Sequence, residues 1–126
     1  MPVRGVDTHL PPVPAAALSA DALRQRFVAP PVWQTEVGRE PRFSPRDSAD
    51  AAVLVALVLR DEPMVLLTER TAHLSTHSGQ VAFPGGRIDA GDEGPVAAAL
   101  RETEEETGIA RHFVEPLGFL DTYLTG

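Results

Sequence analysis

Cysteine is absent from this chain of 126 residues. Its absence excludes disulfide bonds, a thiolate nucleophile and any zinc site built from cysteine sulfur. No apolar run reaches the roughly 18 to 20 residues that a membrane span needs. The first residues also lack the apolar block of a signal peptide. We therefore expect a cytoplasmic protein that makes no membrane contact.

Positive charge is scarce as well. The chain carries 11 basic and 18 acidic residues, for a net charge of -7. Such a balance disfavours unaided binding to nucleic acid or to an anionic membrane. An anionic ligand would need a cation to mediate its binding. The apolar residues, 43% of the chain, are sufficient for the core of one small domain.

The proline distribution divides the chain. Eight of the twelve prolines fall within residues 1–45, where "LPPVPAAAL" and "APPVW" predict extended or turn-like backbone. Between them, "SADALRQRFV" predicts a short helix with Ser19 as its N-cap. We interpret residues 1–48 as a proline-rich arm that wraps a domain formed by residues 49–126.

The domain alternates strand-like and helix-like segments. "AAVLVALVLR" is continuously apolar, as in a strand buried on both faces, and a hairpin is predicted between residues 51–59 and 64–70. "QVAFPGG" predicts a short strand, and "FVEPLGFLDTYL" a further one. Pro95 and Gly108 delimit a helix over residues 95–107. This order of elements predicts an α/β (α+β) fold.

The helix has two distinct faces at about 100° per residue. An apolar stripe that would pack on a sheet consists of Val96, Ala99, Leu100, Thr103 and Thr107. Glu102, Glu105 and Glu106 share another face, whereas Glu104 points away from them. Three neighbouring carboxylates repel one another, and oxygen ligands suit Mg²⁺ or Mn²⁺. The plain alternative is an exposed acidic face.

The Pro-Gly-Gly loop upstream of the helix favours the metal interpretation. Glycine lets backbone groups approach a ligand closely, although Pro-Gly-Gly alone is commonly just a turn. The segment "RETEEETGI", residues 101–109, resembles R-E-U-x-E-E-x-G-U, the end of the Nudix box, where U is a bulky apolar residue. Members of that family are hydrolases that cleave a nucleoside diphosphate linked to another moiety. Their fold is a mixed β-sheet sandwiched between helices, and here it is expected to be C-terminally incomplete.

The front of the box, residues 86–109, departs from the general pattern G-x5-E-x7-R. Five residues separate Gly86 from Asp92, which stands where the pattern has glutamate, and eight residues instead of seven separate Asp92 from Arg101. Glu93 restores the seven-residue spacing to Arg101, but six residues instead of five separate it from Gly86. Asp89 and Asp92 are expected to cap or orient the loop. The same extra residue occurs in the coenzyme A diphosphatase subfamily.

The stretch "LLTERTAHLSTHSGQVAFPGGRIDAGD", residues 66–92, resembles the signature of that subfamily. Thr71 replaces a serine of the signature and Ser75 replaces an arginine, which removes a cation that could contact a phosphate. By position, the resemblance implies Glu102, Glu105 and Glu106 as metal ligands together with a carbonyl of Gly85 or Gly86. Arg101 would orient a box glutamate. The predicted substrate-binding residues are Arg70, His77, Gly79, Gln80, Gly85 and Gly86, and His73 lies beside them. The alternatives are a surface ion pair for Arg70 and hydrogen bonds within the loop for the two histidines.

The resemblance implies Mg²⁺- or Mn²⁺-dependent hydrolysis of coenzyme A or its derivatives to 3′,5′-ADP and 4′-phosphopantetheine. Two alternatives stay open. One is a Nudix hydrolase of ADP-ribose, NADH or a nucleoside triphosphate, which the change at Ser75 favours. The other is an inactive, incomplete domain that binds a nucleotide, a metal or a partner chain. The expected partner is a small nucleotide, and a homodimer is left open.

Overall fold

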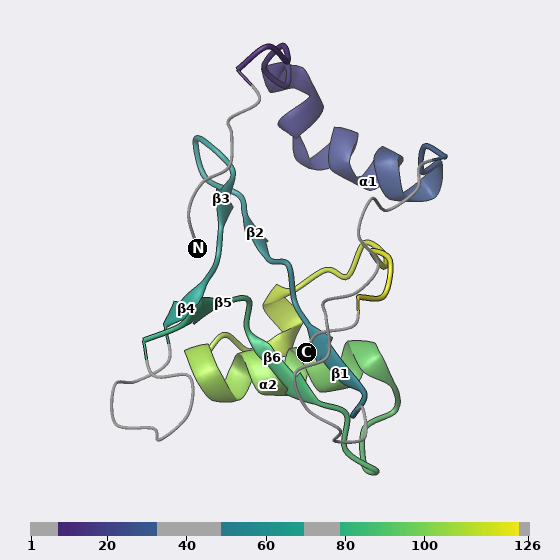
Figure 1. Ribbon diagram of the computed structural model, residues 1–126, viewed down its shortest axis with the longest axis vertical. Helices are drawn as coiled ribbons and strands as arrows, with labels where there is room; N and C mark the ends of the chain where they lie inside the picture. The colour runs from purple at the N-terminus through teal and green to yellow at the C-terminus, as the bar shows by residue number, and fades with distance from the viewer. Residues whose placement is uncertain (1–7, 33–48, 70–78, 124–126) are drawn as a thin grey trace. The chain divides into compact units, whose positions relative to one another are not determined.

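The structure is a computed structural model that describes residues 8–32, 49–69 and 79–123. It separates into two compact units, Met1–Val32 and Trp33–Gly126 (Figure 1). The predicted boundary at residue 48 falls within residues 33–48, outside the described residues. The predicted arm and domain therefore stay a prediction.

The first unit contains the predicted short helix. A 3-10 helix, η1 (Ala15–Leu18), precedes α1 (Ala20–Val28). The Ser19 hydroxyl accepts a hydrogen bond from the amide of Ala22 at 3.2 Å, which satisfies one of the free donors at the helix start. This cap confirms the prediction for Ser19, whereas η1 was not predicted.

The second unit is built on short antiparallel strands. They are β1 (Ala51–Val53), β2 (Leu57–Val58), β3 (Met64–Val65), β4 (Thr68–Glu69), β5 (Val81–Ala82) and β6 (Gly85–Arg87). β2 pairs with β3, and Leu57 lies opposite Val65, so the inner part of the predicted hairpin is confirmed. β1 instead pairs with β6, and β4 with β5. The distant segment 81–87 therefore pairs with the outer part of each arm of the hairpin, β1 and β4.

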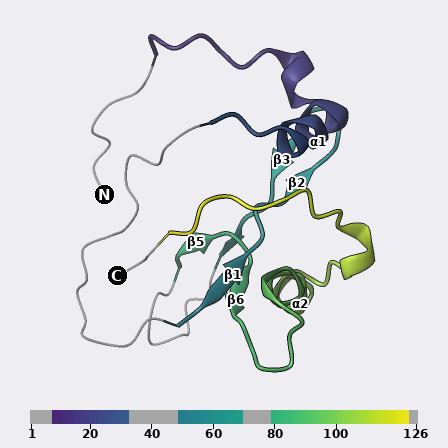
Figure 2. The ribbon, with the colours of Figure 1, turned by 90° about the vertical axis from the view of Figure 1, so that its right-hand side faces the viewer.

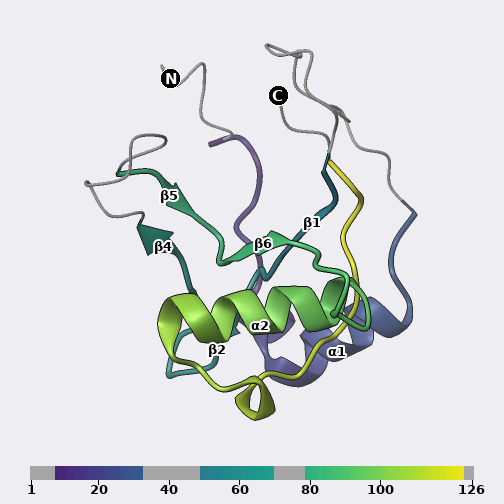
Figure 3. The same cartoon turned by 90° about the horizontal axis from the view of Figure 1, so that it is seen from below.

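Helix α2 (Pro95–Thr107) begins and ends where the sequence predicts. Pro95 occupies its first turn, where a missing N–H costs nothing. Gly108 ends it in the left-handed conformation with φ 74°, and its N–H donates to the Glu104 carbonyl. α2 packs against β1 and β6, and Figures 2 and 3 show it lying alongside β6.

The buried face of α2 differs in part from the predicted stripe. Ala98, Ala99 and Thr103 are the buried residues of the helix. Val96, at 37% exposed, is not among them. The hydroxyl of Thr103 donates to the Ala99 carbonyl at 2.7 Å, which lets a polar side chain lie in the core without an unsatisfied donor.

The segment 51–59 was expected to form one strand buried on both faces, and that expectation is wrong: it contains two strands, β1 and β2, separated by residues 54–56. Alternate residues are exposed along its whole length, among them Val53 and Leu57 at 58% and 40%. The residues between them, such as Ala52 and Leu54, are partly covered. Helix α2 packs against β1, at the start of this segment.

Residues after α2 also depart from the prediction. A 3-10 helix, η2 (Arg111–Phe113), follows Gly108. Residues 114–123, where a strand was predicted, contain no strand among the described residues. Pro116 has no N–H to donate to a ladder, and an apolar pattern forms a strand only beside a neighbouring strand.

The α/β class is confirmed, and the described strands pair only in antiparallel fashion. None of the helices in the described part is both long and apolar enough to cross a membrane.

Candidate functional site

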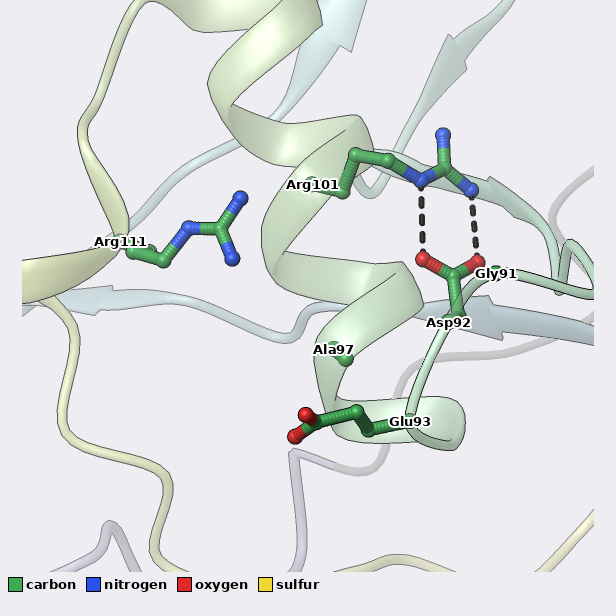
Figure 4. Close-up of a pocket in the computed structure, with 6 residues that line it drawn as sticks. All are labelled: Gly91, Asp92, Glu93, Ala97, Arg101 and Arg111. Carbon is green, nitrogen blue, oxygen red and sulfur yellow. Dashed lines mark hydrogen bonds and ion pairs between the residues drawn. The ribbon is translucent and has the colours of Figure 1, made fainter.

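The side chain of Arg101, in the second turn of α2, is held by the loop that precedes the helix. Its Nε donates to Oδ1 of Asp92 at 3.0 Å and its Nη2 donates to Oδ2 at 2.9 Å. Figure 4 shows the two groups face to face. Nη2 also donates to the carbonyl of Arg87 in β6 at 3.2 Å. This two-point pairing fixes the plane of the guanidinium as well as its position.

The remaining nitrogen of Arg101 faces the acidic side of the helix. Nη1 lies 2.8 Å from Oε1 of Glu102 and 3.5 Å from Oε1 of Glu105. Asp89 contributes a further carboxylate at 3.4 Å from Nη2. Four carboxylates thus surround one guanidinium whose side chain is only 24% exposed. The cation offsets the repulsion that neighbouring glutamates would otherwise suffer.

These contacts change the protonation equilibria of both partners. The pKa of Asp92 falls from 3.8 to about 2, because Arg101 hydrogen-bonds with the carboxylate and the Asp89 amide also donates to it. The pKa of Arg101 is raised, first by Asp92 and then by Glu102. Asp92 is therefore a carboxylate, and Arg101 a cation, at neutral pH.

Asp92 should make stability depend on pH in the acid range. Because its folded pKa lies below its unfolded value of 3.8, its contribution to folding is present above pH 4 and disappears as the pH falls towards about 2. We expect Asp92→Asn to lower the free energy of unfolding near neutral pH, and the two proteins to converge between about pH 4 and 2. Urea titrations at a series of pH values measure this difference. A gap that stays constant down to pH 2 would contradict the assignment.

Gly86 and Glu102 meet at the junction of sheet and helix. Gly86 lies in β6 opposite Ala52 of β1. A Cβ built on Gly86 would lie 2.5 Å from Cδ of Glu102 and 2.7 Å from both of its carboxylate oxygens. Only a residue without a side chain lets the carboxylate rest against this strand. Gly86, Arg101 and Glu102 therefore form one compact group.

Gly85 is constrained by backbone rather than by a side chain. Its φ is 148°, which L-residues rarely adopt, and an added Cβ would collide with the carbonyl oxygen of Ala52 and lie 2.6 Å from Cα of Val53. The two glycines of the loop therefore have different roles. Gly85 lets two strands approach each other, and Gly86 leaves room for the Glu102 carboxylate.

The other predicted site residues lie less close together. Glu105 and Glu106 are exposed, and Glu105 reaches the group only through Arg101. Glu104 instead faces Arg111 of η2 at 3.5 Å. Gly79 and Gln80 are exposed just before β5. Arg70, His73 and His77 lie outside the described residues.

The predicted ligand atoms are of the chemical type that a hard divalent cation prefers. The predicted ligands Glu102, Glu105, Glu106 and the Gly86 carbonyl all offer oxygen, which Mg²⁺ and Mn²⁺ prefer. The space above Gly86 that a Cβ would fill is used by the Glu102 carboxylate. In the part of the chain that the structure describes, no three acidic or histidine side chains already converge on a metal position. The ligand triad remains a prediction.

Two partners of this site were not singled out from sequence. The backbone carbonyl of Arg87 accepts a hydrogen bond from Arg101. Every residue has such a carbonyl, so the amino-acid sequence does not indicate which one is used. Arg111 lies beyond the end of α2, yet it pairs with Glu104 two turns earlier. It also lines a hollow of about 320 Å³ with Gly91, Asp92, Glu93, Ala97 and Arg101 (Figure 4).

Comparison with known proteins supports one family. The NUDIX domain matches residues 49–126. The "Uncharacterized Nudix hydrolase NudL" of Shigella flexneri serotype 5b (strain 8401) is 43% identical over 104 residues, which cover 82% of this chain and 50% of that protein. The protein of the same name in Escherichia coli (strain K12) is 54% identical over 70 residues, covering 56% of this chain and 36% of that protein.

The chain spans about half or less of the length of these curated relatives. The domain match nevertheless covers more than half of the chain and includes β1, β6, α2 and every residue of the Arg101 group. This chain belongs to the Nudix family.

Proposed function

We propose that this chain carries the cation-binding part of a hydrolase that cleaves the diphosphate of coenzyme A or its derivatives, giving 3′,5′-ADP and 4′-phosphopantetheine. The observation that carries the catalytic part is the group formed by Gly86, Arg101 and Glu102. The substrate class rests on the signature-like stretch at residues 66–92. Its setting would be the cytoplasm.

Glu102, Glu105 and Glu106 would hold Mg²⁺ or Mn²⁺, with the Gly86 carbonyl beside them. A bound divalent cation supplies Lewis-acid chemistry: it neutralises diphosphate charge and makes water a better nucleophile at neutral pH. The oxygen of a water molecule would attack one phosphorus of the diphosphate and pass a proton to a carboxylate. The bond from that phosphorus to the bridging oxygen would break, and each product would keep one of the two phosphates of the diphosphate.

The protein residues would divide the remaining work. Glu102 is fixed by Arg101 and by its seat on Gly86, so it suits a ligand that must hold its position. Glu105 and Glu106 are exposed, and Glu105 lies 3.5 Å from Nη1 of Arg101; either would reorient towards a ligand or accept the proton of the attacking water. A positioned carboxylate base contributes on the order of 10² to 10⁴ in rate.

A second candidate is a Nudix hydrolase of ADP-ribose, NADH or a nucleoside triphosphate. Ser75 favours it, because the coenzyme A signature has an arginine there. The chemistry at Gly86, Arg101 and Glu102 would be unchanged, since only the residues that recognise the substrate would differ.

The expected result is that the purified chain with Mn²⁺ or Mg²⁺ converts coenzyme A, and that Glu106→Gln lowers turnover by about 10² to 10⁴ while the far-UV spectrum is unchanged. A panel of coenzyme A, ADP-ribose, NADH and ATP, read by chromatography of the products, separates the two candidates. Intact coenzyme A together with cleaved ADP-ribose would replace the first candidate by the second. Glu106→Gln with full activity would remove Glu106 from the mechanism.

A further inference from the structure

Two adjacent carboxylates, Asp92 and Glu93, are candidates for the position that the first glutamate occupies in the general Nudix box. The structure separates them. The side chain of Asp92 is 7% exposed and forms two hydrogen bonds with Arg101. Glu93 is exposed, and in Figure 4 its carboxylate lies away from the Arg101 guanidinium.

Asp92 is itself held in place by its own loop. Its Oδ2 accepts the amide N–H of Asp89 at 2.8 Å, and its own amide donates to the Asp89 carbonyl at 3.0 Å. This closed turn orients the carboxylate independently of Arg101. The carboxylate and the Arg87 carbonyl then occupy Nε and Nη2 of Arg101, which leaves Nη1 for Glu102 and Glu105.

We propose that Asp92 is the positioning residue of the cation site: it fixes the Arg101 guanidinium and, through it, the place of the Glu102 carboxylate over Gly86. The inference rests on the proposed function for one point, namely that Glu102 is a cation ligand. It does not depend on which diphosphate is cleaved.

The short side chain of Asp92 matches the length of its loop. The segment from Gly86 to Arg101 carries one residue more than the general box. The turn from Asp89 to Asp92 takes up backbone length, and aspartate is shorter than glutamate by one methylene. Asp92→Glu would therefore place its carboxylate beyond the guanidinium that Asp92 now meets at 2.9 Å and 3.0 Å.

Asp92 also decides how strongly Arg101 competes with a metal. Nη1 of Arg101 already occupies the side of Glu102 and Glu105 that faces it. With Asp92 present, most of the guanidinium charge is neutralised and its position is fixed. Without it, Arg101 loses the carboxylate that pairs with it at two points, more of its charge acts on the two proposed ligands, and a divalent ion must overcome that repulsion.

The test is a titration with Mn²⁺ alone, followed by the loss of the free-ion EPR signal, for wild type, Asp92→Asn, Asp92→Glu and the control Glu93→Gln. We expect Asp92→Asn to weaken Mn²⁺ binding by about 10- to 100-fold, the range typical of groups that orient metal ligands. Glu93→Gln should bind as the wild type does, and Asp92→Glu should fall between the two. Equal losses for Asp92→Asn and Glu93→Gln would overturn the proposal, because any nearby charge would then suffice.

A second readout follows Arg101 without metal. The Nε–H resonance of Arg101 in a ¹H–¹⁵N spectrum, assigned by its absence in Arg101→Lys, should exchange slowly in the wild type and in Glu93→Gln. It should be broadened or lost in Asp92→Asn at a pH where the far-UV spectrum shows folded protein. A wild-type chain that binds no Mn²⁺ would contradict the proposed function, while this resonance would still decide whether Asp92 fixes Arg101. An unchanged resonance in Asp92→Asn would overturn the positioning role.

Discussion

Gly86→Ala is expected to disable the site while leaving the fold almost intact. The added methyl group would lie 2.5 Å from Cδ of Glu102, closer than two carbon atoms can approach. The atoms that it meets belong to the end of a flexible side chain, so Glu102 can rotate away at small cost. The carboxylate would then leave the position in which Arg101 holds it.

The expected magnitude follows from that displacement. A functional group moved by about 1 Å loses on the order of 10²-fold in rate, and we expect a loss of that size in turnover of the substrate found by the panel. Mn²⁺ affinity should fall in parallel. The free energy of unfolding should change by less than about 1 kcal/mol, because the atoms that must move are the end of a flexible side chain and no backbone has to shift.

Gly91→Ala is the matched control for Gly86→Ala. Gly91 belongs to the loop before α2, is exposed, and would bring its Cβ within 4 Å of no other group. Both variants add one methyl group to a glycine near the site, and only one of them should affect it. A Gly86→Ala protein that turns over substrate as fast as Gly91→Ala would show that turnover does not depend on the contact between the Glu102 carboxylate and Gly86.

The parts of this site that the sequence predicted are those with local causes. The ends of α2 depend on Pro95 and Gly108, which act through their own backbone geometry. The division between Glu104 and its neighbours follows from helical spacing alone, and Glu104 does pair with Arg111 while Glu102 pairs with Arg101. Local rules of this kind need no knowledge of the rest of the fold.

The parts that the sequence did not predict depend on where distant segments meet. β1 pairs with β6, more than 30 positions away, whereas the sequence predicted a continuous partner in residues 64–70. The exposed alternate residues of 51–59 and the absence of a strand at 114–123 have the same origin, because an apolar segment is buried or paired only if another element lies against it. The choice of Asp92 over Glu93 likewise depended on the path of a loop.

Gly85→Ala should have the opposite effect to Gly86→Ala, a large loss of stability. The added Cβ would meet backbone atoms of β1, the Ala52 carbonyl oxygen and Cα of Val53, and the φ of 148° is itself unfavourable for alanine. Backbone cannot rotate away as a glutamate side chain can. Either the β1–β6 pairing opens, or the loop moves away from α2.

We expect Gly85→Ala to lower the free energy of unfolding by about 3 kcal/mol, since overpacking and a disfavoured φ each cost on the order of 1–3 kcal/mol. That is a large share of the roughly 5–15 kcal/mol of a typical domain. Urea unfolding of Gly85→Ala, Gly86→Ala and Gly91→Ala side by side provides the measurement. If Gly85→Ala unfolded at the same urea concentration as Gly91→Ala, the close approach of β6 to β1 would be refuted. Gly85 would then have no role in the sheet that distinguishes it from Gly86.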